Sequence, residues 1–462
     1  MTNGSLTPLW TSAAIASAVG GAASAAFSVD GVTFDSRDVR PGDLFVALRG
    51  ETLDGHTFVP DAVRRGAAGC LVERGVDAAH VRVADSLAAL ERLAAAARTR
   101  ASAATVIGVT GSVGKTSVKE ALRRAFQRTH AEASHWSVKS YNNHTGVPLS
   151  LARMPADARW AVFELGMNHA GEISVLTRQV RPHVGLITWV APAHIENFAD
   201  GEAGIARAKA EIFEGLEPGG CAVIPADNRH APVLAGRARE LGAQILTFGR
   251  SADADVRLLA ARPAHLGPEL CVDVAGDELR FTLGLEGAHW VSNALAVLAT
   301  VCAAKGDVAE AALALSDMAP LAGRGALLRV PVSGGTAVIL DESYNANPAS
   351  MAAALAVLGA RPERRRLAVL GAMKELGAHS AALHAGLAGP IAEADVSELA
   401  LVGPEMDALA APAAERLADA EQAAAWVRAK LRPGDVLLVK GSNSVGLAAV
   451  VNALAGAEEP AA

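Results

Sequence analysis

The chain has 462 residues, of which 51% are hydrophobic and 20% are charged. At about 150 residues per domain, this length predicts roughly three domains, with enough apolar side chains for several packed cores. The formal net charge of −7 excludes the strongly basic surface by which many proteins bind nucleic acid. The four cysteines (Cys70, Cys221, Cys271 and Cys302) show no C-x-x-C spacing. They fit neither a metal site nor a disulfide framework and favour a reducing compartment.

An uncharged stretch at residues 9–29 has the length of a secretion signal. No Lys or Arg precedes it, and two adjacent glycines, Gly20 and Gly21, interrupt it. We therefore expect no signal peptide. No run is apolar enough to cross a bilayer. The expected location is the cytoplasm, without membrane insertion.

The hydrophobic patterns along the chain predict an α/β protein. Short strand-like pieces and turns come first and end in an Ala-rich helix over residues 86–100. From residue 105, β-branched runs alternate with helical patterns, which indicates a parallel sheet with helices on both faces. A second alternating series begins near residue 325. We expect a small mixed α/β domain at 1–102, a central phosphate-loop ATPase domain at 103–322 and a Rossmann-like domain at 323–462.

The segment GVTGSVGKTS, residues 108–117, follows a β-branched strand and precedes a helical pattern that begins near Ser117. A phosphate-binding loop requires this context. Glycines let backbone N–H groups turn toward phosphate oxygens, a lysine supplies charge, and a threonine hydroxyl can bind Mg²⁺. The Walker A pattern has glycine where this chain has Val109, so a plain glycine turn stays the alternative. The expected ATP-binding residues are Thr110, Gly111, Ser112, Val113, Gly114, Lys115, Thr116 and Ser117.

Two further polar residues lie at the ends of predicted strands. Glu164 closes WAVFEL, and His194 follows GLITWV after a short loop. Because ligands bind at the carboxyl ends of parallel strands, both side chains are expected beside Thr116. Taken alone, Glu164 is equally an ordinary strand-end charge and His194 an ordinary loop histidine. Together the three form a candidate Mg²⁺ set beside ATP, since magnesium prefers oxygen ligands and one imidazole is tolerable.

A lysine lies within the apolar stripe of the helical segment GIARAKAEIFEGL. Lys209 is four residues after Ile205 and four before Phe213, whereas the neighbouring charges fall on the opposite face. Such a lysine often extends its amine to the surface along its apolar neighbours. The alternative is burial, which lowers the pKa of the amine and makes it reactive. The pattern alone leaves both interpretations open.

Five segments, in the order TGSVGKTS, YNNHTGVPLSL, FELGMNHAGEI, APAHIENF and ARAKAEIF, resemble the ATP-dependent Mur ligases of peptidoglycan synthesis. The N-terminal GVTFDSRDVRPGDLFVALRGETLDGHTF is similar to a UDP-binding domain of that family. The family loop is T-G-[ST]-x-G-K-[ST], so Val109 is no defect. The resemblance implies catalytic roles for Lys115, His194 and Lys209, the last as a carbamate formed with CO₂. The metal ligands that it implies are Thr116, Glu164, His194 and carbamylated Lys209.

The resemblance also implies contacts with both substrates. Two of these positions have ordinary structural interpretations as well. Asn347 precedes Pro348 and suits a helix N-cap, and Asp341 ends a predicted strand and suits a turn. The implied nucleotide contacts are Asn293, Arg324, Asp341, Tyr344 and Asn347. The implied UDP-substrate contacts are Ser36, Arg37, His56, Asn142 and Asn143.

The C-terminal segment DESYNANPASM is similar to family members that add D-alanyl-D-alanine. The function that this implies is an ATP-dependent amide ligase, which joins the dipeptide to a UDP-N-acetylmuramoyl-tripeptide through an acyl phosphate. Another amino-acid-adding Mur ligase, a folylpolyglutamate synthase and a regulatory nucleotide switch are the alternatives. The expected partners are small-molecule substrates alone, and the chain is expected to be a monomer.

Four positions depart from the family pattern. Trp189 stands in place of Asn, Ala372 of Asp, Lys374 of a hydrophobic residue and Asn443 of Arg. The first lies near the nucleotide crevice and the others lie in the C-terminal domain. We expect these changes to affect contacts with the dipeptide rather than the class of reaction.

Overall fold

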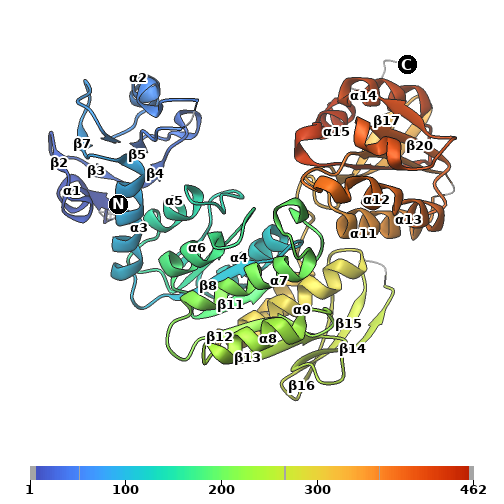
Figure 1. Ribbon diagram of the computed structural model, residues 1–462, viewed down its shortest axis with the longest axis horizontal. Helices are drawn as coiled ribbons and strands as arrows, with labels where there is room; N and C mark the ends of the chain where they lie inside the picture. The colour runs from blue at the N-terminus through green and yellow to red at the C-terminus, as the bar shows by residue number, and fades with distance from the viewer. Residues whose placement is uncertain (1–6, 51, 265–266, 364, 457–462) are drawn as a thin grey trace, which may run out of the picture.

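The computed structural model describes residues 7–50, 52–264, 267–363 and 365–456. Three bodies follow one another along the chain, and each is built on its own main β-sheet (Figure 1). The expectation of a three-domain α/β protein is therefore confirmed. Among the described residues, no helix is both long enough and apolar enough to cross a membrane.

The N-terminal body is a five-stranded sheet with helices on both faces. Side chains alternate along β5 (Asp43–Val46), so that Leu44 and Val46 pack with helices α1 and α3 whereas Phe45 packs with α2. The helices are α1 (Ser12–Val19), α2 (Val59–Arg64) and α3 (Ser86–Arg100). The strand order is β2 (Ala22–Ala23), β7 (His80–Arg82), β6 (Gly69–Val72), β5 (Asp43–Val46) and β4 (Gly31–Thr33), and β1 (Trp10–Thr11) pairs with β3 (Ser28–Val29) beside it.

The central body holds a nine-stranded sheet in which β8, between β11 and β10, leads into the phosphate-binding loop. The strands from β9 to β14 run parallel, as the alternating pattern predicts, whereas β15 and β16 extend the sheet as an antiparallel hairpin that was not predicted. The strand order is β16 (Asp277–Thr282), β15 (Glu269–Val274), β14 (Val256–Arg262), β13 (Gln244–Gly249), β12 (Cys221–Pro225), β11 (Val184–Ile187), β8 (Thr105–Thr110), β10 (Trp160–Glu164) and β9 (Ser134–Trp136).

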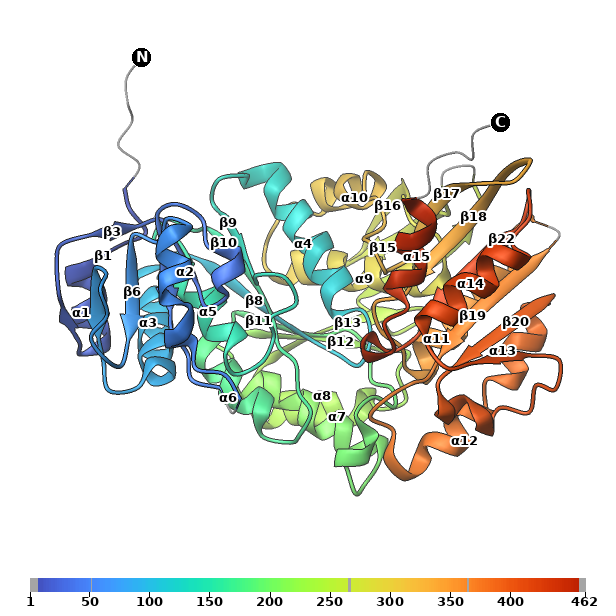
Figure 2. The same ribbon diagram turned by 90° about the horizontal axis from the view of Figure 1, so that it is seen from above.

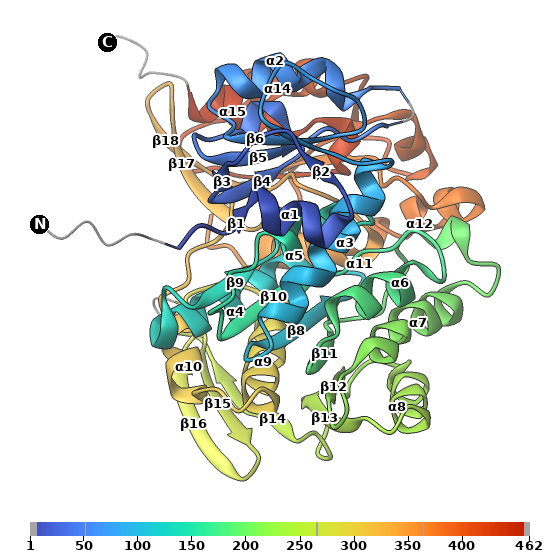
Figure 3. The same cartoon turned by 90° about the vertical axis from the view of Figure 1, so that its left-hand side faces the viewer.

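Helices cover both faces of this central sheet (Figure 3). One face packs on α4 (Lys115–His130), α9 (Ala288–Ala303) and α10 (Val308–Ser316). The other packs on α5 (Gly146–Ala152), α6 (Glu172–Val180), α7 (Glu202–Ala210) and α8 (Ala231–Glu240). Helix α4 begins at Lys115 rather than near Ser117, and the helix that carries Lys209 tightens into a 3₁₀ turn at Glu211–Gly215.

The C-terminal body is a six-stranded sheet in which only the first strand runs antiparallel. The strand order is β17 (Ala326–Val332), β18 (Gly335–Glu342), β22 (Val436–Lys440), β19 (Arg366–Gly371), β20 (Glu398–Val402) and β21 (Glu415–Leu417). The helices are α11 (Pro348–Gly359), α12 (Ser380–Ala385), α13 (Ala388–Glu393), α14 (Ala420–Lys430) and α15 (Ala448–Ala455). The carboxyl ends of β18 and β22 lie toward the central body, which places their last residues at a shared cavity.

Two arginines of α3 join the N-terminal body to the central one, and the two bodies lie side by side in Figure 2. Arg98 is buried and donates hydrogen bonds to the carbonyls of Val180 and Arg181, both at 2.8 Å. The guanidinium of Arg100 lies 3.6 Å from the centre of the Trp10 ring and donates to two backbone carbonyls. The Arg98 bonds and the Arg100 bond to the Met154 carbonyl cross the junction, and they hold the two bodies in one orientation.

Candidate active site

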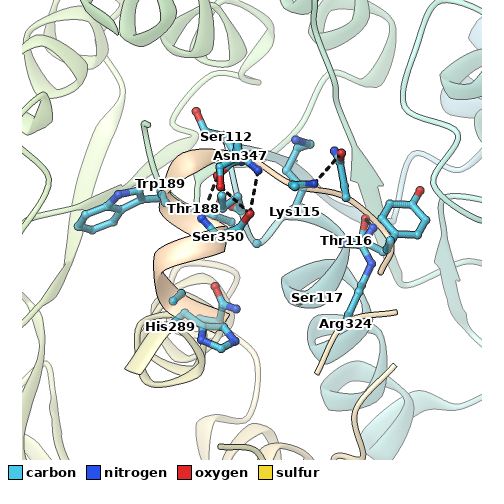
Figure 4. Close-up of a pocket in the computed structure, with 18 of the residues that line it drawn as sticks. Ser112, Lys115, Thr116, Ser117, Thr188, Trp189, His289, Arg324, Asn347 and Ser350 are labelled. Carbon is cyan, nitrogen blue, oxygen red and sulfur yellow. Dashed lines mark hydrogen bonds between the residues drawn. The ribbon is translucent and has the colours of Figure 1, made fainter. Parts of the chain in front are cut away.

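A cavity of about 600 Å³ lies between the central and C-terminal bodies (Figure 4). Its floor is the loop after β8, and its walls come from the ends of β10 and β11, from α9 and from the start of α11. Parallel strands bring these ends to one edge of the sheet, where α/β proteins bind ligands. The sequence-predicted residues that line it are Ser112, Val113, Gly114, Lys115, Thr116, Ser117, Asn142, Glu164, His194, Asn293, Arg324, Tyr344 and Asn347.

The loop has the backbone of an anion-binding turn. Gly114 has a φ of 84°, in the left-handed region, and a Cβ added there would lie 2.7 Å from Asn293 Oδ1. The Lys115 ammonium donates to the Gly111 carbonyl at 2.7 Å and closes the loop on itself. Its desolvation lowers the pKa of Lys115, while the Glu164 carboxylate opposes that shift. The start of α4 therefore presents backbone N–H groups and one lysine to the cavity, which suits a phosphate chain.

A hydroxyl and a carboxylate meet at the loop. The Thr116 hydroxyl donates to Glu164 Oε2 at 2.8 Å, and Asn142 donates to Glu164 Oε1, also at 2.8 Å. Glu164 is 1% exposed. These oxygens fit Mg²⁺, which takes few protein ligands and completes its shell with water and substrate phosphates. The strand-end reasoning thus placed Thr116 and Glu164 together correctly.

His194 lies at the rim of this group, in a left-handed conformation with a φ of 57°. Its Nδ1 is 2.5 Å from Oε2 of Glu375, in the C-terminal body, but no hydrogen bond forms there within the described part of the chain. Burial, together with the nearby Lys115 and Lys209 amines, lowers the pKa of His194 to about 4. Across the described residues, no three His, Cys, Asp or Glu side chains are grouped to hold a metal ion. Thr116 and Glu164 are the two predicted metal ligands that contact each other directly, and metal binding by His194 stays a prediction.

Lys209 is buried, as one of the two interpretations of its helix required. Only 2% of the residue is exposed, and it packs among Ile205, Ile212 and Phe213 of the same apolar face. Burial, with a further contribution from the Lys115 charge, holds the pKa of Lys209 well below its usual range. The side chain does not extend to solvent, so the interpretation in which the amine reaches the surface is wrong. Lys209 does not itself line the cavity.

The C-terminal candidates reach the cavity in different ways. The Arg324 guanidinium stacks over Tyr344 at 3.9 Å and donates to the Thr116 hydroxyl oxygen at 3.1 Å. Asn347 caps α11, since its Oδ1 accepts from the Ser350 amide at 2.9 Å, and its Nδ2 lies 3.5 Å from the Ser112 carbonyl. It serves as cap and cavity wall at once. Asp341 lies outside the lining and holds the linker instead, accepting from the Gly323 amide at 2.7 Å.

The candidates for the UDP-substrate lie mainly away from this cavity. Ser36 is buried, and Arg37 is exposed but paired with Asp35 at 2.7 Å. His56 offers no free polar atom, because Nδ1 contacts Asp54 at 2.6 Å and Nε2 accepts from the Glu73 amide at 2.9 Å. A direct uridine contact by His56 does not fit this arrangement.

The two asparagines of the central body differ from each other. Asn142 lines the cavity beside Glu164, as its bond to that carboxylate requires. Asn143 is exposed and turns its Oδ1 to the Gly146 amide at 3.0 Å, at the start of α5. Direct contact with the substrate therefore stays a prediction for Asn142 and is weakened for Asn143 by this local bond.

Comparison with known proteins agrees with these features. The "Mur ligase middle domain" family matches residues 109–301, the "Mur ligase, glutamate ligase domain" family residues 323–443, and the "Mur ligase family, catalytic domain" residues 28–107. A UDP-N-acetylmuramoyl-tripeptide–D-alanyl-D-alanine ligase of Synechocystis is 35% identical over 446 residues, or 94% of this chain and 93% of its own. The chain belongs to the Mur ligase family. The ligase of the same name from Escherichia coli is 34% identical and covers 92% of this chain and 94% of its own.

Solved structures extend the likeness of this Mur ligase to the whole fold. MurF from Acinetobacter baumannii superposes with a TM-score of 0.84 at 29% identity and covers 98% of this chain and 100% of its own. MurF from Thermotoga maritima, in complex with ADP, superposes with a TM-score of 0.76 at 26% identity, over 92% of this chain and 97% of its own. Folylpolyglutamate synthase of Mycobacterium tuberculosis, at 17% identity and a TM-score of 0.63, shares the fold alone.

The four departures from the family pattern fall in two places. Trp189 lines the cavity, and its carbonyl accepts from the Ser112 amide at 2.8 Å. Ala372 is buried behind β19, Lys374 pairs with Glu405, and Asn443 is exposed. The changes leave the Thr116–Glu164 pair untouched.

Several cavity residues escaped the sequence reasoning. Lys440 is 2% exposed, and its ammonium donates to Glu342 at 3.3 Å and to the Asn345 carbonyl at 2.9 Å. Its position at the end of a predicted strand was the one available signal. His289 lies at the start of α9, where nothing local marks it. The cavity residues that were not predicted from the sequence include Glu342, Lys440, His289 and Ser350.

Proposed function

We propose that this Mur ligase joins D-alanyl-D-alanine to a UDP-N-acetylmuramoyl-tripeptide and converts ATP to ADP and phosphate. The observation that carries the proposal is a phosphate-binding loop whose Thr116 is hydrogen-bonded to the buried Glu164, in a cavity shared by two bodies. Relatives that bear this activity in their names match over more than nine-tenths of both chains. A solved MurF in complex with ADP supports nucleotide binding by this chain, which we assign to this loop.

The first chemical step is phosphoryl transfer to the substrate. The terminal carboxylate of the tripeptide attacks the γ-phosphorus, the bond to the β-bridging oxygen breaks, and an acyl phosphate and ADP result. Lys115 and the N–H groups at the start of α4 stabilise the charge that develops on the phosphoryl oxygens. Thr116 and Glu164 would hold Mg²⁺, which when bound neutralises charge on the β- and γ-phosphates.

The second step forms the amide. The dipeptide amine attacks the acyl carbon, the bond from that carbon to the phosphate-bearing oxygen breaks, and phosphate leaves. No enzyme nucleophile takes part. His194 is neutral at pH 7, given its low pKa, and lies where Glu375 of the C-terminal body meets the central body. Its neutral imidazole suits either metal binding or acceptance of the amine proton.

Lys209 is proposed to react with CO₂ and to act as a carbamate. Burial lowers the pKa of its amine and so favours the neutral form, which attacks CO₂ and loses a proton to water. The reaction would turn this amine, which is near enough to Lys115 and His194 for their charges to interact, into an anion. The carbamate oxygens would supplement Thr116 and Glu164 as ligands of the metal.

We assign roles to the three parts of the chain on the same basis. Residues 1–102 are proposed to bind the UDP moiety, with Ser36 and Arg37 as contacts, and 103–322 to bind ATP. Residues 323–462 are proposed to supply nucleotide contacts and to bind the dipeptide. Arg324, Tyr344 and Asn347 already reach the cavity from that part. We further propose that the enzyme acts in the cytoplasm as a monomer on small-molecule substrates alone.

A substrate panel tests the proposal. Phosphate release is measured with each of several UDP-N-acetylmuramoyl-peptides against D-alanyl-D-alanine, L-lysine, diaminopimelate and glutamate. The expected outcome is release only with a UDP-tripeptide and the dipeptide together, with a product mass equal to their sum less water. Release with a single amino acid would favour another amino-acid-adding ligase. ATP binding without any ligated product would favour the nucleotide switch.

A further inference from the structure

The buried carboxylate at the catalytic loop already has a cation beside it. Glu164 is 1% exposed, and its two oxygens accept from the neutral groups of Thr116 and Asn142. An ionised carboxylate at this depth needs a compensating positive charge. The Lys115 ammonium is near enough to interact with this carboxylate, but it donates its hydrogen bond to the Gly111 carbonyl. The group that contacts the Thr116–Glu164 pair directly is the Arg324 guanidinium, 3.1 Å from the Thr116 oxygen.

The guanidinium and a divalent cation compete for the same atom. The Thr116 hydroxyl uses its one hydrogen on Glu164, so a metal ion at this oxygen would have to share its lone pairs with the Arg324 N–H. A metal bound at that oxygen and at the Glu164 carboxylate would lie within a few ångströms of the guanidinium charge. Two cations at that separation repel strongly in a partly buried site.

Arg324 is held in place by residues of the C-terminal body. The linker around it is fixed by Asp341 of β18, whose carboxylate accepts from the Gly323 amide at 2.7 Å and whose carbonyl accepts from the Gly325 amide at 2.8 Å. Its guanidinium stacks over Tyr344, also from that body. When Arg324 leaves Thr116, the linker must therefore move with it, whereas Thr116 and Glu164 keep their places in the central body.

We propose that Arg324 holds the place of the divalent cation at Thr116 and Glu164, and that cation binding releases this contact between the two bodies. The inference rests on the proposed function, because it concerns how the metal enters the same site. Arg324 keeps the carboxylate compensated in the metal-free protein and lowers its affinity for a metal without nucleotide. Because coupling is reciprocal, whatever releases the Arg324 contact also tightens metal binding.

The first test measures Mn²⁺ binding in the absence of nucleotide, by the electron paramagnetic resonance signal of the free ion. Arg324→Gln should bind Mn²⁺ about tenfold more tightly than the wild type, because one nearby like charge is removed. Arg329→Gln, which removes an exposed charge from β17 of the same body, should bind as the wild type does. Glu164→Gln should abolish Mn²⁺ binding both in the wild type and in Arg324→Gln. Equal affinity in Arg324→Gln and the wild type, or Mn²⁺ that persists in Glu164→Gln, would overturn the proposal.

The second test uses the unaltered chain and does not depend on how a variant folds. Phenylglyoxal modifies accessible arginines, and peptide mass spectrometry reports the rate at Arg324. Mg²⁺ alone should speed modification of Arg324 several-fold and leave Arg329 unchanged. An unchanged or slower rate at Arg324 would contradict displacement. Ligation by the wild type is scored separately, so that an active ligase without these effects refutes this inference alone, and the effects without ligation refute the proposed function alone.

Discussion

The Thr116 hydroxyl donates a 2.8 Å hydrogen bond to the Glu164 carboxylate, and so joins the first turn of α4 to the end of the neighbouring strand β10. The two residues are 48 positions apart. They meet because β8 and β10 are adjacent parallel strands whose carboxyl ends share one edge. The pair combines a phosphate-binding helix start with a buried negative charge, and the proposed phosphoryl transfer depends on it.

Removing the charge of Glu164 tests this pair. Glu164→Gln keeps the shape and can still accept from Thr116, but it loses the anion that compensates a metal cation. We expect ligation to fall by roughly 10²–10³-fold and the Mg²⁺ concentration for half-maximal rate to rise. Glu240→Gln, at an exposed helix end, is the matched control and should retain wild-type activity. Wild-type metal dependence in Glu164→Gln would remove Glu164 from the metal site.

Removing the ammonium of Lys115 tests the phosphate-binding loop. Lys115→Ala should lower ligation by roughly 10²–10³-fold, since the developing phosphoryl charge loses one preorganised partner. Lys430→Ala, which breaks a pair with Glu398 far from the cavity, should leave the rate unchanged. Initial rates of ADP formation at saturating substrates provide the measurement. Near-normal turnover in Lys115→Ala would exclude the lysine from the mechanism.

Local patterns predicted the central part of this site because its residues follow individual strands. Glu164 ends β10, and Thr116 lies in the first turn of the helix that follows the loop after β8. The parallel pairing of β8 and β10 brings the two positions together. Lys209 was also found locally, since its place among apolar helix positions allowed burial. The choice between burial and extension to solvent needed the packing of α7 against the rest of the central body.

Other features needed relations between distant parts of the chain. Lys440 and Glu342 enter the cavity because the C-terminal body stands over the central one, and no local pattern encodes that placement. Asp341 lies near the end of a strand, as predicted, yet its carboxylate accepts a hydrogen bond from the Gly323 amide of the linker. The antiparallel strands β15 and β16 were missed because a short hairpin at a sheet edge lacks the continuous apolar run of a buried parallel strand.

Carbamylation of Lys209 is testable by spectroscopy. Protein equilibrated with ¹³C-bicarbonate should show a carbamate carbonyl resonance that is absent in Lys209→Ala. Lys209→Ala should lose most activity with little loss of stability, because alanine favours the helix and the neighbours are apolar. Lys209→Arg should be inactive too, since guanidinium stays charged and does not take up CO₂. An active wild-type enzyme with no carbamate signal under bicarbonate would refute the modification.

The lowered pKa values of two histidines predict how stability depends on pH. Burial lowers the pKa of His135 to about 4, from an ordinary value of 6.5, against the bond from its Nε2 to the Ser150 carbonyl. Between those pH values the unfolded chain binds a proton that the folded protein rejects, so the free energy of unfolding falls as the pH falls. His194 has the same shift. His135→Gln should therefore lose of order 1 kcal/mol less than the wild type between pH 7.5 and 5.0.

Urea unfolding followed by circular dichroism at the two pH values gives this comparison. Wild-type curves at both pH values serve as the reference. An equal loss of stability in His135→Gln and the wild type would show that His135 does not reject its proton in the folded protein.

The most direct test of the account follows the oxygen of the substrate carboxylate. The UDP-tripeptide is prepared with ¹⁸O in its terminal carboxylate and incubated with ATP, Mg²⁺ and D-alanyl-D-alanine. Because phosphate leaves with the oxygen through which the acyl group was phosphorylated, one ¹⁸O should appear in each phosphate released, and only when all three substrates are present. Phosphate without ¹⁸O, or released at the same rate without the dipeptide, would contradict ligation through an acyl phosphate.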